Sequence, residues 1–199
     1  MFKIVEAKDV ELIKKIYRFR CAIACDELKI LKREDFPDGL ETDEYDNFST
    51  HLAALTKVGE VIACLRLIHD SPIGYPTKNE MKIEKDLSFI DPNREGEISR
   101  IFIHNRYRDM RSTKLIIHSL KREVFKKMIE LNIEYSYGAL EKPFFRLLRI
   151  LKMPYEIIGT EQIHGGRMRY PSILYTNKLL EENKDFYEIL MDVKCLEEL

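Results

Sequence analysis

Apolar residues along the chain follow two periods, which predict short strands and amphipathic helices. Apolar residues that alternate with polar ones, or that form a short run between turn signals, indicate strands. We therefore expect strands over residues 2–5, 51–56, 60–68, 97–103, 133–139, 157–163 and 167–176. Apolar residues that recur every three to four positions indicate helices. These are expected over residues 9–28, 79–87, 112–131 and 143–152, with a helical tail from residue 177 onward.

The order of these elements predicts an α/β fold, in which a mixed, twisted central sheet carries helices on both faces. Strands 97–103 and 133–139 are joined through helix 112–131, which makes a parallel crossover. Ligands of such folds bind near the carboxyl ends of neighbouring parallel strands. The 199 residues contain no repeat and no linker, so we expect one domain over residues 1–199.

The composition is that of an ordinary globular protein, with 45% hydrophobic and 34% charged residues. No apolar run approaches the roughly 20 residues of a membrane-spanning helix, and the first residues lack the pattern of a signal peptide. We therefore expect a cytoplasmic protein without an integral membrane segment. The cysteines at positions 21, 25, 64 and 195 have neither CxxC nor disulfide-framework spacing, so reduced, packed thiols and no metal site are expected.

Several functional motifs are absent from the sequence. It contains no GxGxxG after a strand, no phosphate-binding GxxxxGK loop, no HExxH and no GxSxG. No bound cofactor is therefore indicated. Nucleic acid is not an expected partner, because tryptophan is absent and no RNA-binding aromatic motif occurs. The glycines after His164 indicate a hairpin turn rather than an oxyanion-hole loop, because no nucleophile motif accompanies them.

Charged residues stand where the apolar pattern predicts a core. Arg20 lies in the apolar stripe of the first helix, Arg66 interrupts a buried strand, and Glu97 and Arg100 project to opposite sides of another strand. Buried charges are unfavourable unless they are paired, and the stretch 41–46 supplies four carboxylates. These charges form either an ion-pair network that ties a loop to the sheet or a polar site, and their convergence favours the polar site.

A basic segment follows strand 97–103. Residues 106–127 hold eight Lys or Arg and two Asp or Glu. On the helix, Arg111, Lys114, His118, Arg122 and Lys126 share one face, opposite an apolar face. This basic face is either a docking surface for an acidic partner or ordinary solvated surface.

Four motifs in order carry a family resemblance: FPDGLETDEYD (36–46), STH (49–51), LRLI (65–68) and EISR (97–100). Together they resemble the autoinducer-synthase branch of the GNAT acyltransferase superfamily, and within it the long-chain N-acyl amino acid synthases. The segment HGGRMRYP (164–171) extends the likeness weakly. The resemblance implies a GNAT-type sheet. Acyl-homoserine lactone synthases carry an aromatic residue and a tryptophan where this chain has Ala24 and about Ile30, which favours the amino acid synthases.

The resemblance implies roles for individual residues. Glu97 is the expected general base for the amine, and backbone N–H groups near Ile101 and Phe102 would polarise the thioester carbonyl if the strand bulges there. Ser99 would contact the acyl head. The remaining matched residues would bind the carboxylate of the amino acid or order the loop over it: Arg20, Asp43, Asp46, Arg66 and Arg100.

The resemblance also implies the donor. The glycine-rich loop with which ordinary GNAT enzymes hold the coenzyme A pyrophosphate would fall at residues 105–112, which read NRYRDMRS without glycine. We therefore expect a long-chain acyl group on the phosphopantetheine of an acyl carrier protein. The residues expected to meet this carrier are Arg106, Arg108, Arg111, Lys114, Lys121 and Arg122.

Three functions remain open. The first is acyl transfer to the α-amine of an amino acid, with tyrosine suggested by family resemblance and by Tyr135 and Tyr137 near the expected cleft. The second is acyl-homoserine lactone synthesis from S-adenosylmethionine. The third is a non-catalytic module that binds acyl carrier protein, in which the same charges only hold a loop.

Overall fold

The computed structural model describes residues 2–188. The expected helical tail from residue 177 is therefore tested only as far as residue 188, and Cys195 lies outside the described residues. The tail begins as expected, with helix α5 (Thr176–Glu182) followed by a short 3₁₀ turn at Lys184–Phe186. Cys21, Cys25 and Cys64 are free and buried, as the sequence predicts.

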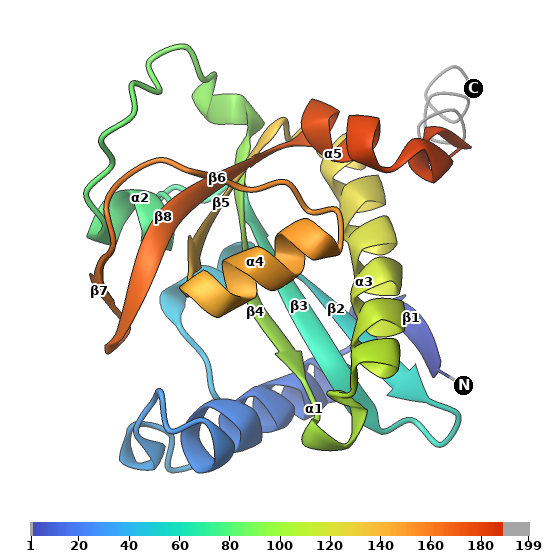
Figure 1. The fold of residues 1–199 in the computed structure, drawn as a ribbon. Coiled ribbons are helices and arrows are strands. Elements are labelled where there is room, and N and C mark those ends of the chain that lie inside the picture. The colour runs from blue at the N-terminus through green and yellow to red at the C-terminus, as the bar shows by residue number, and fades with distance from the viewer. Residues whose placement is uncertain (1, 189–199) are drawn as a thin grey trace.

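A single mixed sheet forms the centre of the fold (Figure 1). Its strands are β1 (Phe2–Glu6), β2 (Ser49–Thr56), β3 (Val61–His69), β4 (Glu95–Ile103), β5 (Tyr135–Leu140), β6 (Glu156–Ile157), β7 (Gln162–His164) and β8 (Arg167–Tyr175). Their order is β1-β2-β3-β4-β5-β8-β6, with β7 paired to β8. Strands β4 and β5 are parallel and the other pairs antiparallel. The mixed sheet and its parallel crossover confirm the predicted α/β fold.

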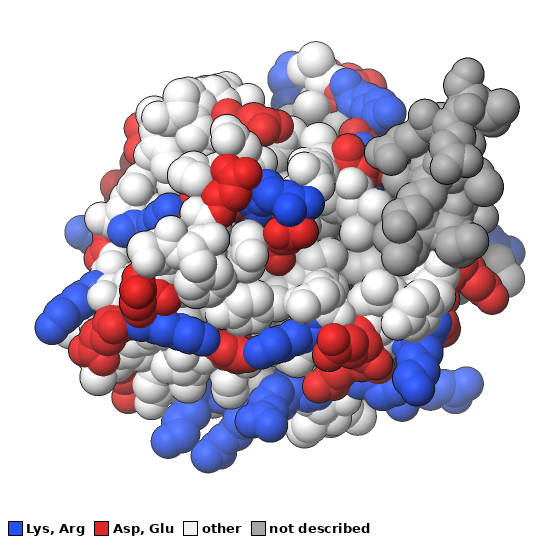
Figure 2. All heavy atoms as spheres, turned by 90° about the horizontal axis from the view of Figure 1, so that it is seen from above, with Lys and Arg blue, Asp and Glu red and all other residues white. Residues whose placement is uncertain are grey.

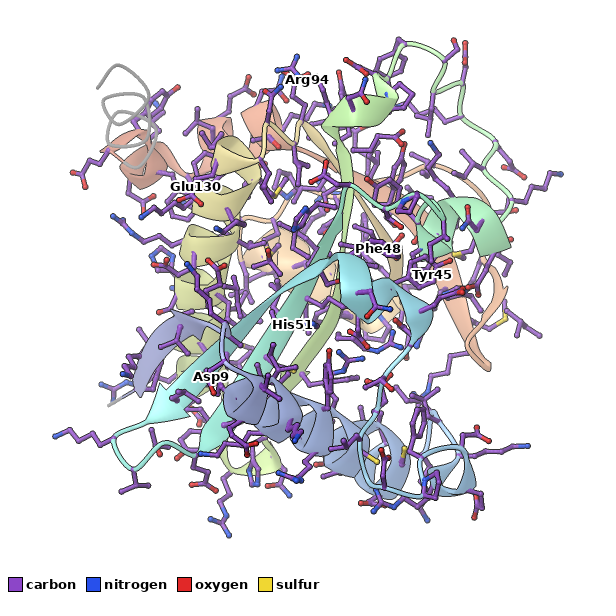
Figure 3. All side chains as sticks on the ribbon, turned by 180° about the vertical axis from the view of Figure 1, so that it is seen from behind. Asp9, Tyr45, Phe48, His51, Arg94 and Glu130 are labelled. Atoms are coloured by element: carbon purple, nitrogen blue, oxygen red, sulfur yellow. The ribbon has the colours of Figure 1, made fainter. Side chains whose placement is uncertain are left out.

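Helices cover both faces of the sheet, as expected. They are α1 (Val10–Cys21), α2 (Pro76–Glu80), α3 (Met110–Glu130), α4 (Lys142–Ile150) and α5. Residues of α3 pack with Leu52, Leu65 and Leu148 in the largest hydrophobic cluster, whereas α1 packs with Ala53 and Cys64 in another. Figures 1 and 3, seen from opposite sides, show α3 and α4 on one face and α1 on the other.

Helix α1 changes from α-helical to π-helical hydrogen bonding at its C-terminal end. Its N-terminus is capped by Asp9, whose side chain accepts a hydrogen bond from the Leu12 amide at 2.8 Å. After Cys21 the chain continues as a π-helical segment, Ala22–Glu27, instead of the regular helix expected to residue 28. Such segments often occur at functional sites. The segment delivers Leu28 and the residues after it to the wall of a cavity described below.

Two expected elements differ from the structure. The helix expected over residues 79–87 is only the short α2, because the chain becomes extended at Met81, whose side chain is buried. The strand expected over residues 157–163 is divided into β6 and β7 at Gly159. A Cβ atom on Gly159 would lie 2.6 Å from the carbonyl oxygen of Lys82. This close approach to another segment needs a glycine and interrupts the strand.

The feature of the sheet that matters most for function is a bulge in β4. Cys64 pairs with Phe102 and Arg66 with Ser99, so two residues of β4, Arg100 and Ile101, stand where β3 supplies one. Arg100 has a φ of 52°, in the left-handed region. On its other side, β4 pairs with β5 only at Glu95–Glu97. Beyond Glu97 the two parallel strands separate, and the edge of β4 is open.

No helix within residues 2–188 is both long and apolar enough to cross a membrane. The net charge of the whole chain is −1, and on the face in Figure 2 basic and acidic side chains lie interspersed.

Candidate active site

Three arginines and three carboxylates form a buried ion-pair network between α1, β3, β4 and the loop before β2. The arginines are Arg20, Arg66 and Arg100, and the carboxylates are Glu41, Asp43 and Asp46. Arg20, Glu41 and Arg66 are all 0% exposed. The three positive charges of the arginines are balanced by the three negative charges of the carboxylates. Buried ions require such pairing.

Arg20 joins α1 to the loop. Its Nε donates to Glu41, and its two terminal nitrogens donate to the two oxygens of Asp46 at 2.7 and 3.0 Å. This bidentate pairing uses the planar fork of the guanidinium. The guanidinium also lies 5.1 Å from the centre of the Tyr17 ring.

Arg66 and Arg100 join the loop to the sheet. Arg66 donates to Asp43, to Asp46 at 2.9 Å and, through Nε, to the Ser99 hydroxyl at 2.9 Å. Arg100 donates to Glu41 at 2.8 Å and to Asp43 at 2.9 Å. Asp43 thus bridges two strands, and the network ties the loop to β3 and β4 together.

The pKa values of the carboxyls reflect these contacts. Burial alone would raise the pKa of Glu41, but the guanidinium groups of Arg100 and Arg20 lower it to about 2. Burial acts in the same direction on Asp46, and Arg20 and Arg66 hold its pKa well below the ordinary range. Both groups are therefore ionised at neutral pH.

The network orders the loop it contacts. Asp43 and Asp46 form a capping box around the 3₁₀ turn Glu44–Phe48. The turn brings Tyr45 next to α2, where its hydroxyl accepts a hydrogen bond from Asn79 at 3.1 Å (Figure 3). The ion pairs thereby position one wall of the cavity.

Glu97 lies on the same side of β4 as the ion-pair network but does not belong to the network. Its carboxylate accepts hydrogen bonds from the Thr77 amide at 2.8 Å and the Thr77 hydroxyl at 3.0 Å. The residue is 2% exposed. Burial raises the pKa of Glu97 to about 7, although the Thr77 hydrogen bonds and the more distant Arg66 and Arg100 act to lower it. At neutral pH Glu97 can therefore both accept and release a proton.

A cavity of about 610 Å³ opens beside Glu97 and the bulge of β4. Its apolar lining combines the end of the first helical segment, β4, β5 and α4: Leu28, Ile30, Leu31, Ile98, Ile101, Phe102, Ala139, Leu140, Pro143 and Phe144. Its polar lining includes Asp43, Glu44, Tyr45, Glu80, Glu97, Ser99, Arg100, Glu141, His164, Arg167 and Arg169. An apolar site with convergent polar groups has the character of a small-molecule pocket.

The structure divides the predicted site residues into two groups. Glu97, Ser99, Arg100, Ile101, Phe102 and Asp43 line the cavity, whereas Arg20, Asp46 and Arg66 lie behind it in the network. Alternation along β4 predicts that Glu97 and Arg100 point to opposite sides, and this is wrong. The bulge shifts the alternation, so Arg100 reaches the same Asp43 carboxylate as Arg66, whose Nε contacts Ser99.

The basic face of α3 is exposed as predicted, except that Arg122 is half-buried. Arg111, Lys114, His118 and Lys126 are exposed, and the opposite face of α3 is buried. Lys121 does not belong to this basic face and its assignment is corrected. It is buried, donates to the Leu151 carbonyl at 2.9 Å and to Asn183, and lies 5.3 Å from the Phe186 ring centre. Helical periodicity places it between the faces, and the segment that follows α5 covers it with Asn183 and Phe186.

Arg106 and Arg108, which precede α3, are exposed. Arg108 also donates to Glu27 and to the Ile103 carbonyl at 2.7 Å, and so ties the end of β4 to the π-helical segment.

Tyr135 and Tyr137, which suggested an aromatic acceptor, do not line the cavity. The Tyr137 hydroxyl donates to buried Glu95 at 2.6 Å, and Tyr135 packs against Phe89 and Tyr175. The positions of Tyr135 and Tyr137 therefore give no support to tyrosine as the acceptor.

Sequence reasoning missed several residues of the site. Glu41 is one of the four carboxylates in the stretch 41–46, but its position in the sequence does not show that it is the one that bridges Arg20 and Arg100. Thr77 gave no signal, because its role depends on how α2 packs against β4. Arg167 and Arg169 belong to the weak HGGRMRYP motif, which does contribute to the cavity. Its glycines form the β7–β8 turn with φ values of 55° and 72°, which confirms the predicted hairpin.

No group of His, Cys, Asp and Glu suited to a metal ion occurs within residues 2–188.

Comparison with protein families gives one match. Residues 19–118, half of the chain, match the model described as an acetyltransferase (GNAT) domain. This span includes the ion-pair network, Glu97 and the bulge. No curated protein matches the chain.

Solved structures share the fold at low sequence identity. TofI, in a ternary complex with an inhibitor and MTA, matches with a TM-score of 0.67 and 14% identity over 90% of this chain and 95% of that chain. BjaI, a CoA-dependent acyl-homoserine lactone synthase with SAM and isopentyl-CoA, gives 0.66 and 16%, over 94% and 89%. FeeM, an N-acyl amino acid synthase from uncultured soil microbes, gives 0.61 and 12%, over 92% and 94%.

We predict that Asp46→Asn destabilises the protein by about 3 to 5 kcal/mol, because it leaves Arg20 and Arg66 buried with too little negative charge. Chemical denaturation at pH 7 measures the effect. Asp26→Asn, an exposed position in the π-helical segment, is the matched control and is expected to stay within about 0.5 kcal/mol of the wild type. Equal stabilities of the two variants would contradict the structural role of the network.

Proposed function

This chain belongs to the GNAT acetyltransferase family and is an acyltransferase, and from that premise we propose that it is an N-acyl amino acid synthase. In the proposed reaction, the α-amine of an amino acid attacks the thioester of a long-chain acyl carrier protein. The new bond is the amide C–N bond, and the bond that breaks is the thioester C–S bond. The products are an N-acyl amino acid and the carrier's free thiol.

The observation that carries the proposal is Glu97, a buried carboxyl with a pKa of about 7 on the wall of the cavity. Amino acid amines are protonated at neutral pH, so the nucleophile must lose a proton before or during attack. Glu97 takes this proton, directly or through a water molecule. A base with a pKa near the working pH suits this step.

The bulge in β4 supports the second requirement, polarisation of the thioester carbonyl. Beyond Glu97 the edge of β4 is not paired with β5, so backbone N–H groups near Ile101 and Phe102 are candidates to donate to the carbonyl oxygen as it gains negative charge. The bulge re-aims these groups because it shifts the alternation of the strand. Ser99, on the same wall, contacts the acyl head in this arrangement.

The apolar lining supports an acyl substrate. Leu28, Ile30 and Leu31 face side chains of β4, β5 and α4 across the cavity, and burial of acyl methylene groups there supplies roughly 0.8 kcal/mol each. An acyl chain that fills this apolar space would displace water from the thioester and so protect it from hydrolysis. Arg20, Arg66 and Arg100, together with Asp43 and Asp46, act mainly by ordering the loop over this space.

The proposed donor is acyl carrier protein. Residues 105–112 lack the glycines that would let backbone amides approach a pyrophosphate closely, and the basic face of α3 suits an acidic protein. BjaI, which shares the fold, is described as CoA-dependent, so acyl-coenzyme A is the competing donor.

Acyl-homoserine lactone synthesis is the second candidate, because TofI, BjaI and LasI share this fold. The products distinguish the two reactions. We expect purified protein, supplied with lauroyl-carrier protein and an equimolar mixture of the twenty protein amino acids, to form an N-lauroyl amino acid that mass spectrometry identifies. Formation of methylthioadenosine and a lactone from S-adenosylmethionine would favour the second candidate. A protein that forms neither product would be a binding module.

We predict that Glu97→Gln lowers kcat by about 10²-fold, because the amide cannot accept the proton. In the wild type, kcat/KM should rise with pH through about 7 as Glu97 ionises. The variant should lose this rise, and its turnover is measured from pH 5.5 to 9. Near-normal turnover of the variant would remove Glu97 from the mechanism.

The same substitution should not unfold the protein. The native pKa of Glu97 lies above its ordinary value of 4.5, so the native state binds more protons and Glu97 costs stability as pH rises from about 4.5 to 7. Glu97→Gln removes this cost, and its melting temperature at pH 8 should equal or exceed that of the wild type.

Thr77→Val gives an independent test of the same base. Loss of the Thr77 hydroxyl removes a hydrogen bond to the charged form, which contributes about 1.5 kcal/mol or more and corresponds to about one pH unit. The midpoint of the kcat/KM profile should therefore move upward by about one unit. Thr77→Ser retains the hydroxyl and should restore the wild-type midpoint, and an unmoved midpoint in Thr77→Val would contradict the assignment.

We predict that simultaneous reversal of charge at Arg111, Lys114 and Arg122 to Glu raises KM for acyl carrier protein by about tenfold or more, chiefly through slower association. KM for a small acyl-pantetheine should change little, because that donor needs no docking surface. Steady-state kinetics with both donors measures the difference. The wild-type advantage with carrier protein should also fall as salt approaches 1 M, where the screening length is about 3 Å.

A matched variant with the same change in net charge reverses the exposed lysines Lys3, Lys8 and Lys57. It should behave as the wild type with both donors. An equal rise in KM for both donors in the charge-reversed α3 variant, or a wild-type preference for acyl-coenzyme A, would contradict a docking role. The basic face would then be ordinary solvated surface.

A further inference from the structure

One wall of the cavity carries an arginine that the protein neutralises only weakly. Arg169 projects from β8, and its side chain is 19% exposed. Within residues 2–188 its guanidinium donates no side-chain hydrogen bond, and its nearest carboxylate oxygen, on Glu141, lies 4.0 Å away. A guanidinium that is mostly buried without hydrogen-bond acceptors is unfavourable unless something else supplies them.

Neighbouring charges increase this deficit. Glu141 is shared, because Arg167 also contacts it at 3.4 Å while donating to the Leu28 carbonyl at 2.9 Å. Arg100 is near enough to act on Arg169 as well. Burial lowers the pKa of Arg169, Glu141 acts to raise it, and the charges of Arg100 and Arg167 act to lower it further. Arg100 has its own carboxylates in the network. One terminal nitrogen of Arg66 is also unpaired, but Arg66 does not line the cavity. Among the arginines that line the cavity within residues 2–188, Arg169 therefore has the most open donors.

The turn beside Arg169 leaves room for its guanidinium. Gly165 has a φ of 55°, and a Cβ atom there would lie 3.1 Å from Nη1 of Arg169. Gly165 and Arg169 both line the cavity. A side chain at position 165 would crowd the guanidinium, whereas glycine leaves its edge free to meet a ligand.

Besides its three arginines, Arg100, Arg167 and Arg169, the cavity carries acidic side chains. Glu97, Glu44 and Glu80 belong to β4, the 3₁₀ turn and α2, and they line the same space. Glu80 also pairs with His164 at 3.4 Å. The cavity therefore offers carboxylates and an under-neutralised arginine to the same ligand, as a zwitterion requires.

We propose that Arg169 binds the α-carboxylate of the acceptor amino acid and thereby selects amino acids over other amines. The planar guanidinium accommodates a carboxylate through two parallel hydrogen bonds, and this pairing would hold the α-amine within the cavity that Glu97 lines. The inference rests on the proposed function and deepens it, because it assigns acceptor recognition to β8 and not to the arginines of the network. A phosphate of the donor has related chemistry, so the experiment measures both substrates.

The test uses lauroyl-carrier protein as donor and two acceptor mixtures, the twenty protein amino acids and their carboxamides. The wild type is expected to acylate the amino acids about 10²-fold better than the carboxamides, consistent with hydrogen bonds between charged groups. In Arg169→Met, kcat/KM for the amino acids should fall by about 10²-fold, consistent with loss of hydrogen bonds between charged groups. The values for the carboxamides and KM for the donor should not change, so the preference disappears.

Two further variants separate binding from folding. Arg169→Lys keeps the charge but not the fork and should retain part of the preference, and Arg149→Met, at an exposed position on α4, should keep all of it. Melting temperatures of the variants verify that each is folded. If Arg169→Met is unfolded, the inference is decided by the preference of Arg169→Lys, which must fall below that of the wild type.

The outcomes also separate this inference from the proposed function. A wild type that acylates neither mixture would overturn the proposed function and this inference with it. A wild type that acylates both mixtures equally, or an Arg169→Met variant that keeps the preference, would overturn only the role of Arg169. An increase in donor KM with an unchanged acceptor preference would assign Arg169 to the donor's phosphate and overturn carboxylate recognition.

Discussion

The pairing of three guanidinium groups with three carboxylates, most of them buried, is the constraint on which the rest of this structure depends. Arg20, Arg66 and Glu41 are completely buried, and a charge in that environment is tolerated only beside its partner. Each contact joins elements that are distant in the sequence, so α1, the loop before β2, β3 and β4 must meet in one arrangement. If the loop before β2 moved away, it would leave unpaired arginines buried in the interior, which is unfavourable. The ion pairs therefore keep this loop, and with it one wall of the cavity, in place.

The bulge in β4 connects this framework to the proposed chemistry. In a regular strand, Arg100 would point away from Asp43, and the alternation of sides would continue without interruption through Ile101 and Phe102. With one extra residue, Arg100 joins the network, and the following backbone lies at the edge that β5 no longer covers. The left-handed φ of Arg100 is unfavourable for a residue with a side chain, and the contacts of Arg100 with Glu41 and Asp43 compensate for it.

The ionisable groups of the site differ in their pKa values and in how completely they are paired, because they contact different partners. Carboxyls that contact arginines directly, such as Glu41, have lowered pKa values and serve as fixed anions. Glu97 contacts Thr77 instead, and burial raises its pKa to about 7. Arg169 is the converse case, a cation without a full set of acceptors. On a fold similar to those of TofI, BjaI and FeeM, this chain therefore holds stable ion pairs next to ionisable groups that are less completely paired.

The sequence by itself determined the order of the elements, the α/β fold and the positions of Arg20, Arg66, Glu97 and the acidic stretch, because apolar periodicity and charges that interrupt it are local properties. Only the tertiary structure decided the rest. The bulge reversed the expected side of Arg100, the segment after α5 buried Lys121, and the packing of α2 gave Glu97 its Thr77 partner. Whether a charge is paired depends on which distant segment lies within about 4 Å of it, and no pattern along the chain contains that distance.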